Sequence, residues 1–147
     1  MNGLIVFGIL IGLVALATLL GVLWRARTGR VRAVVHETVV DASDLGPGAV
    51  IGSDATLLQF STSVCAPCRV THSVLDELAG GRAGVSHVDV DITRRSDLAN
   101  RYRVLQAPTT FILDGRGVVQ ARIGGVPRAA EVVAELDRIL HTAPAVA

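Results

Sequence analysis

The distribution of apolar positions separates one long N-terminal segment from the rest of the chain. Residues 3–24 carry no charged side chain and consist mainly of Leu, Ile, Val, Gly and Ala. As a helix, this segment would measure roughly 33 Å, enough to cross a hydrocarbon core of about 30 Å. No basic stretch precedes it and no A-x-A cleavage pattern follows it, which disfavours a cleaved signal peptide. We therefore predict a transmembrane helix over residues 3–24.

The remaining chain alternates between strand-like and helix-like patterns. A valine-rich run predicts a first strand over residues 34–40, after a basic juxtamembrane linker over residues 25–33. From residue 56 onward the predicted order is strand, helix, strand, helix, strand, strand, helix, over residues 56–60, 65–79, 85–92, 96–102, 109–113, 118–123 and 127–140. Residues 143–147 are predicted to be a disordered tail.

The order of these elements predicts the fold class. Helical crossovers make the earlier strands parallel, whereas the turn Asp114-Gly115-Arg116-Gly117 joins the last two as an antiparallel hairpin. The sequence therefore predicts an α/β domain over residues 34–142, with a mixed central sheet and helices on both faces.

Charge refines the picture of the membrane segment. All 14 basic residues are arginines, and four of them follow the apolar segment within residues 25–32. The positive-inside rule then places the domain in the cytoplasm, with an inner membrane of bacterial type as the setting. From residue 33 onward, ten arginines face all 13 acidic residues, a net charge of −3 that argues against a nucleic-acid surface. Gly8 and Gly12 form a G-x-x-x-G pattern that could pair with another helix.

The candidate chemistry lies in the only two cysteines, in Cys65-Ala66-Pro67-Cys68. They fall between a predicted buried strand and a predicted helix. Cys65 would lie at the helix N-terminus, where free N–H groups and the helix dipole favour a thiolate. Cys68 is one turn away, and Pro67 suits the first helical turn. The pair can therefore cycle between dithiol and disulfide.

Several segments together resemble the thioredoxin superfamily. They are the strand 57–60, the C-x-x-C, the strand 87–91, and Ala107-Pro108-Thr109 followed by the glycine-containing hairpin. The resemblance covers roughly residues 34–140 and implies a thioredoxin-like three-layer fold.

The resemblance also implies roles for individual residues. Cys65 would attack a substrate disulfide and Cys68 would resolve the mixed disulfide. Pro108 would have a cis peptide bond beside the cysteines. The backbone at Ala107 and Thr109 would bind an extended substrate segment, and Gly124 or Gly125 would let that segment approach closely. We expect a protein disulfide or dithiol as the partner, no cofactor, and no metal at this site.

Three residues depart from the family pattern. Val64 stands where tryptophan is usual, Gln59 where many thioredoxins have a buried acid, and His87 where they often have a lysine. Gln59 cannot titrate, and His87 would replace the lysine only in part. These departures favour a dedicated partner over general thioredoxin activity. The Ala-Pro dipeptide resembles the Gly-Pro of reducing thioredoxins, which favours a reductase.

Two alternatives stay open. Cys65, Cys68 and His72 could instead carry a metal such as copper, or the pair could carry thiols, for a membrane partner. An extracytoplasmic relative acting in thiol or cytochrome c maturation would have the domain on the other side of the membrane.

Overall fold

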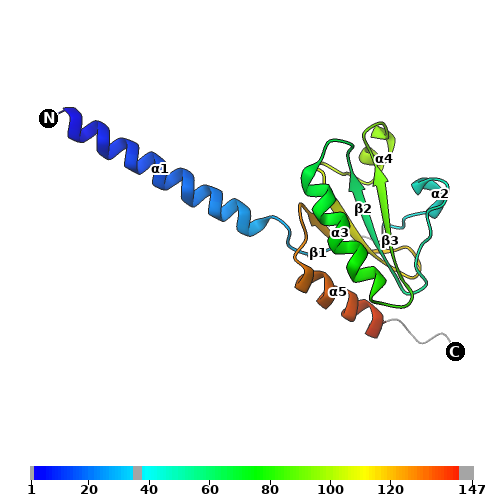
Figure 1. The fold of residues 1–147 in the computed structure, drawn as a ribbon. Coiled ribbons are helices and arrows are strands. Elements are labelled where there is room, and N and C mark those ends of the chain that lie inside the picture. Colours follow the sequence, from blue (N-terminus) through cyan, green and yellow to red (C-terminus); the bar gives the residue numbers. More distant parts are fainter. Residues whose placement is uncertain (1, 35–37, 143–147) are drawn as a thin grey trace.

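A computed structural model describes residues 2–34 and 38–142. The N-terminal helix α1, Asn2–Arg27, projects away from the domain that follows it (Figure 1). The domain elements are, in chain order, β1 (Arg32–Ala33), α2 (Ala42–Leu45), β2 (Ala55–Ser61), α3 (Ala66–Gly80), β3 (Val85–Asp91), α4 (Ser96–Arg101), β4 (Thr109–Asp114), β5 (Val119–Gly124) and α5 (Ala129–Thr142).

The five strands form one sheet in the order β1-β5-β4-β2-β3. Only β2 and β3 run parallel, joined through the α3 crossover, and the other neighbours are antiparallel. Side chains alternate between the two faces along each strand, so neighbouring residues of β2 enter different cores. Leu57 packs with α3 and α5 on one face, and Leu58 packs with α2 and α4 on the other. The mixed sheet with helices on both faces confirms the predicted fold class.

Each face of the sheet has its own apolar core. The core under α3 and α5 contains fully buried Leu75, Ile112 and Leu136. The other core is centred on aromatic rings, with Phe60 lying 5.1 Å from Phe111 and 5.8 Å from Tyr102 between ring centroids. Burial of large side chains on both faces supplies the main driving force for folding, about 25 cal/mol per Å² of apolar area.

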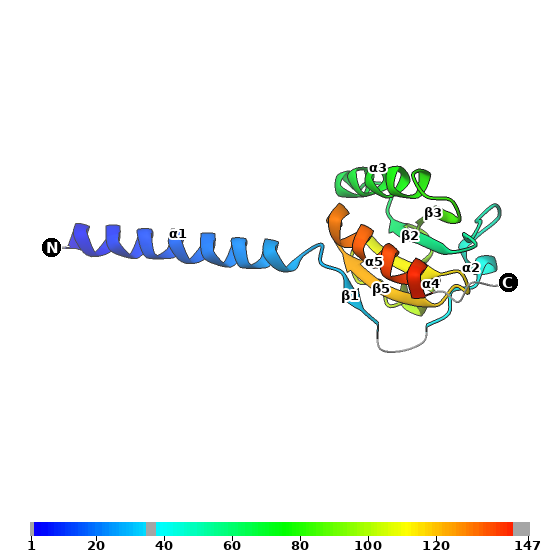
Figure 2. The same cartoon turned by 90° about the horizontal axis from the view of Figure 1, so that it is seen from below.

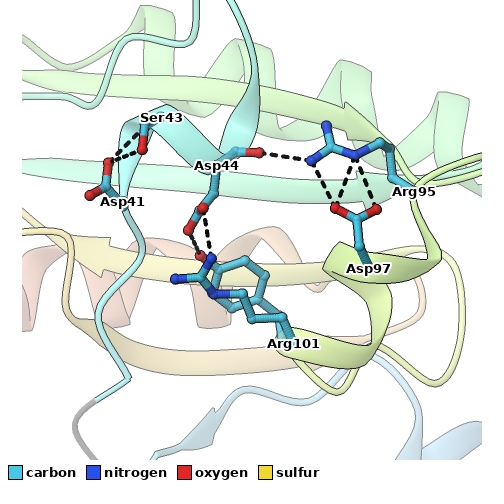
Figure 3. Close-up of polar contacts among 7 residues, drawn as sticks. Asp41, Ser43, Asp44, Arg95, Asp97 and Arg101 are labelled. Atoms are coloured by element: carbon cyan, nitrogen blue, oxygen red, sulfur yellow. Dashed lines mark hydrogen bonds and ion pairs between the residues drawn. The ribbon is translucent and has the colours of Figure 1, made fainter.

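A polar network fastens α2 to α4 at the edge of the aromatic core (Figure 3). The Asp44 carboxylate accepts hydrogen bonds from Arg101 Nη1 at 2.8 Å and from the Tyr102 hydroxyl at 2.7 Å. Arg95 Nη2 donates to the Asp44 carbonyl at 3.4 Å. Burial and the contact with Asp44 raise the pKa of Tyr102 to about 12, so its hydroxyl remains a donor at neutral pH.

The predicted strand over residues 34–40 forms no assigned strand among its described residues, although Val34 N donates to the Gln120 carbonyl and Val40 N to the Gly117 carbonyl. The first strand is β1, whose Arg32 and Ala33 pair with β5 inside the predicted linker. Within 34–40, Val39 forms an isolated bridge to Val118, and residues 35–37 lie outside the described part of the chain. The edge strand β1 is held by backbone hydrogen bonds, which do not require a particular pattern of side chains. The valine-rich run therefore did not mark its position. The predicted tail over residues 143–147 also lies outside the described residues.

Helix α1 is long and apolar enough over Gly3–Ala26 to cross a membrane, and none of this span is buried against the domain. Length and composition alone support this interpretation, and a signal sequence has the same properties. Figure 2 shows the helix leaving the domain on the side where β1 and the start of α5 lie.

Candidate active site

The cysteines and Pro108 lie at the same end of the sheet. Strand β2 ends at Ser61, and the chain passes through a short loop into α3. Because β4 runs antiparallel to β2, its first residue, Thr109, pairs with Phe60 near the end of β2. The loop before α3 and the loop before β4 therefore meet beyond this end of the sheet.

The two cysteines differ in exposure. Cys65 is the N-cap of α3 and is partly exposed, whereas Cys68 lies in the first turn and is 4% exposed. They form a disulfide with their Cα atoms 5.2 Å apart. The backbone N–H of Cys68 donates to Cys65 Sγ at 3.2 Å. The same N–H, with the helix dipole, would stabilise a thiolate on Cys65 in the reduced form.

Gln59 lies beneath the cysteine pair and is fully buried. Its Nε2 donates to the Cys68 carbonyl at 3.0 Å, which ties the first turn of α3 to the centre of the sheet. Its Oε1 is buried without a hydrogen-bond partner among the described residues. An amide neither gains nor loses a proton near neutral pH, so Gln59 positions Cys68 but does not act as its acid or base.

His87 lies against α3 and makes no hydrogen bond with Gln59. In the β2–β3 register, Leu57 pairs with His87 and Gln59 pairs with Asp89. The His87 ring lies 4.8 Å from the His72 ring, and its Nδ1 lies 3.7 Å from Asp76 Oδ1. Burial, followed by the charge of His72, lowers the pKa of His87. The cluster cannot be recognised from the sequence, because the contact depends on how α3 lies on β3.

The loop before β4 has the backbone form that the resemblance implied for it. The peptide bond between Ala107 and Pro108 is cis. The Pro108 carbonyl accepts from Gly125 N at 2.8 Å, and Thr109 pairs with Gly124. Gly125 has φ +86°, a conformation that strongly favours glycine. Ala107 is partly exposed next to Pro108, just before the start of β4.

Exposed apolar side chains stand in the loops around the cysteine pair and Pro108. Val64 is 94% exposed directly before Cys65, and Leu105 is 91% exposed directly before the Pro108 loop. Val126, 39% exposed, follows Gly125. In the sequence, Val64 stands out only as a departure from the family pattern, and Leu105 and Val126 do not stand out at all. The signal that could have identified these residues is that they are large and apolar yet lie in loops next to the predicted site.

The end of α1 is fastened beside this site. Gly29 N donates to the Gly124 carbonyl at 2.8 Å, next to the end of β5. Arg128 Nη2 donates to the Ala26 carbonyl at 3.4 Å, and Glu131 Oε2 accepts from Val31 N at 3.0 Å. The segment between α1 and β1 is therefore docked on the domain through several hydrogen bonds.

Known proteins match both the sequence and the fold. The thioredoxin family model matches residues 48–138. Thioredoxin M4, chloroplastic, of Arabidopsis thaliana is 31% identical over 112 residues, which is 70% of this chain and 58% of that protein. The thioredoxin of Bacillus subtilis (strain 168) is 30% identical over 95 residues, which is 63% of this chain and 89% of the relative.

Solved structures agree with the sequence comparison. Chloroplastic thioredoxin z has a TM-score of 0.53 at 25% identity, covering 59% of this chain and 79% of that one. A mutant thioredoxin from Halobacterium salinarum NRC-1 has a TM-score of 0.54 at 20% identity, covering 63% and 80%, and shows the fold alone. The chain therefore belongs to the thioredoxin family, and its domain carries the close cysteine pair of a thiol–disulfide oxidoreductase.

Proposed function

We propose that the protein is a membrane-tethered reductase of protein disulfides that works through the Cys65/Cys68 pair. The observation that carries this proposal is the unequal exposure of two cysteines joined as a disulfide. Cys65 is accessible at the start of α3, and Cys68 is buried one turn further on. The accessible sulfur suits attack on a substrate, and the buried one suits resolution inside the protein.

The reaction starts from the dithiol form. The Cys65 thiolate attacks one sulfur of the substrate disulfide, that disulfide breaks, and the other substrate sulfur leaves as a thiolate. Cys68 then gives up its proton and attacks Cys65 Sγ, which breaks the mixed disulfide and forms the Cys65–Cys68 bond. Two electrons pass to the substrate, and the two released thiolates take up two protons from solvent and from Cys68. A dithiol donor must then return two electrons to the pair.

The surroundings of the pair support an extended polypeptide as the substrate. The backbone at Ala107 is partly exposed just before β4, where a peptide can pair by main-chain hydrogen bonds. Thr109, also expected to bind the peptide, is 1% exposed and lies between Phe60 and Gly124 in the sheet, so the proposal rests on Ala107. Val64, Leu105 and Val126 would contact apolar side chains of that peptide. Gly124 and the cis Pro108 would lie beneath the bound peptide.

The dipeptide between the cysteines supports reduction as the direction. The dipeptide between the cysteines is Ala66-Pro67, without a histidine that would stabilise the reduced pair. Equilibration of the full chain with glutathione redox buffers measures the potential. We expect a value below about −200 mV, whereas a value well above it would identify an oxidant.

The membrane anchor would hold the active-site end of the domain near the lipid surface. Helix α1 supplies the transmembrane segment over residues 3–24, and the bond between Gly29 and Gly124 fastens its end beside the substrate edge. The four arginines of residues 25–32 favour a cytoplasmic domain in a bacterial-type inner membrane. A phosphatase fused to the C-terminus should be inactive in cells. An active fusion would place the domain outside the cytoplasm and favour a role in thiol maturation there.

Cysteine variants of the full chain in detergent test the central proposal. Cys65→Ser should reduce a model protein disulfide no faster than the dithiol donor alone. Cys68→Ser should instead accumulate mixed disulfides through Cys65, visible on non-reducing gels and identifiable by mass spectrometry. Ser73→Ala, an exposed position on the same helix, serves as a matched control. Full activity of Cys65→Ser would contradict the proposal.

A further inference from the structure

Four metal-ligating side chains converge on the interface between α3 and β3. His72 and Asp76 are four residues apart on α3 and therefore share one helix face. His87 and Asp89 are two residues apart on β3 and therefore share one sheet face. Helix α3 lies along this side of the sheet (Figure 1), which brings the two pairs together. His72 Nδ1 lies 3.4 Å from Asp89 Oδ2 and His87 Nδ1 lies 3.7 Å from Asp76 Oδ1.

We propose that His72, Asp76 and His87 bind a divalent transition-metal ion of the zinc type, with Asp89 as the carboxylate that orients His72. One ligand atom from each of the three lies within 4.8 Å of the other two. Ligands about 2.1 Å from a zinc ion at tetrahedral angles stand about 3.4 Å apart. The ligand atoms would therefore have to move only slightly closer together to bind the ion. The side chains of His72 and Asp76 are 51% and 73% exposed, so they can turn to do this.

His87 provides a second observation. Its side chain is 4% exposed, and its Nε2 is buried without a hydrogen-bond partner among the described residues. The 3.7 Å from Nδ1 to Asp76 is longer than a hydrogen bond. Nδ1 is the His87 nitrogen that faces Asp76, and a metal bond at Nδ1 would give the buried imidazole a polar partner that it otherwise lacks.

The donor set selects the kind of ion. Two imidazoles with one or two carboxylates suit Zn²⁺, Co²⁺, Ni²⁺ and Cu²⁺, whereas Mg²⁺ and Ca²⁺ prefer oxygen ligands throughout. The cluster contains no cysteine, so the site should bind while Cys65 and Cys68 form their disulfide. A metal there would join α3 to β3 and stabilise the folded state by mass action. This site is separate from the proposed reductase chemistry and does not rest on it.

The test uses the full chain in detergent with its disulfide intact and Co²⁺ as a spectroscopic probe. We expect one saturable equivalent with visible absorption bands, displaced by Zn²⁺. His72→Gln and Asp76→Asn alter exposed side chains and should each weaken binding at least about 10-fold, and His87→Gln should abolish it. Asp89→Asn should weaken binding about 10-fold through the orientation of His72.

His141→Gln is the matched control, because His141 is an exposed histidine on α5 that contacts the Asp137 carbonyl. It should bind Co²⁺ like the unaltered chain. At the same Zn²⁺ concentration, the melting temperature should rise for the unaltered chain and for this control, and it should rise less for His72→Gln. The proposal is overturned if the oxidised chain shows no saturable binding, or if the double variant His72→Gln/Asp76→Asn binds as tightly as the original. Binding that appears only after reduction assigns the metal to the cysteines and also overturns it.

Discussion

The interface between α3 and the sheet has two ends with opposite chemistry. At the end under the disulfide, Gln59 is buried and neutral, and its one described hydrogen bond goes to the Cys68 carbonyl. Further along the helix, the exposed side chains of His72 and Asp76 meet the buried side chain of His87. The side chain bonded to the Cys68 backbone is therefore an amide, whereas the ionisable cluster on α3 lies one to two turns further along the helix. A thioredoxin fold can thus hold its cysteine pair in place with an amide while proton-exchanging groups sit elsewhere on the same helix.

The largest change in the free energy of unfolding is expected when a charge is placed at the end under the disulfide, where Gln59 lies. Gln59→Glu would leave a carboxylate buried against the Cys68 carbonyl, so we expect the free energy of unfolding to fall by about 3–5 kcal/mol at a pH near 8. Burial would raise the pKa of this glutamate above its unfolded value of about 4.3. The loss should therefore grow as the pH rises above that value and shrink in acid. Urea unfolding across this pH range measures it.

Gln106→Glu is the matched control for that change, because Gln106 is exposed in the loop before β4. Its free energy of unfolding should stay within about 0.5 kcal/mol of the original. If Gln59→Glu were equally harmless, the end under the cysteines would have to be open to water, and the contrast between the two ends would disappear.

The next largest effect is expected in the pH dependence of stability, at the end where His87 lies. The pKa of His87 is lowered by burial and then by the charge of His72. A lowered pKa in the folded state means that the unfolded chain binds a proton first as the pH falls below about 6.5. The contribution of His87 to stability is therefore present above that pH and is lost below it. His87→Gln should flatten the fall in unfolding free energy between about pH 6.5 and pH 5, measured by urea unfolding in metal-free buffer.

His72→Gln sharpens this prediction. Removing the His72 charge should let His87 take up its proton at a higher pH, which NMR titration of the imidazole C–H signals can follow. An unchanged His87 titration in this variant would show that the two rings do not interact, contrary to their 4.8 Å separation.

The smallest effect is expected between the two ends, at Thr71. This residue faces the sheet from α3, is fully buried, and its Oγ1 has no hydrogen-bond partner among the described residues. Thr71→Val keeps the shape and removes the unpartnered hydroxyl, so its unfolding free energy should be unchanged or up to about 1 kcal/mol higher. Thr71→Ala, which leaves a gap, should lose about 1 kcal/mol instead. A loss above about 2 kcal/mol in Thr71→Val would reveal a bound water that links Thr71 to its polar neighbours.

Most of the domain from residue 56 onward could be predicted, because its elements have strong periodic patterns. The helix after Cys65 repeats apolar residues at helical spacing, and the strand pair around the Asp114 turn is bounded by turn residues. The first strand was misplaced because β1 is an edge strand of two residues held by the backbone of β5. The exposed apolar residues Leu105 and Val126 were missed because loop residues have no period that marks them.

The sequence by itself determined the chemistry that the protein can perform and the order of its elements. Two cysteines three residues apart, a following helix and a later Pro-Thr are local features, and local spacing is enough to define them. Only the tertiary structure decided which distant groups meet. It placed the Gln59 amide on the Cys68 carbonyl, Gly29 on Gly124, and His87 beside His72 and Asp76. Such contacts depend on strand register and on the angle at which a helix lies on a sheet, and both are set by packing of the whole core.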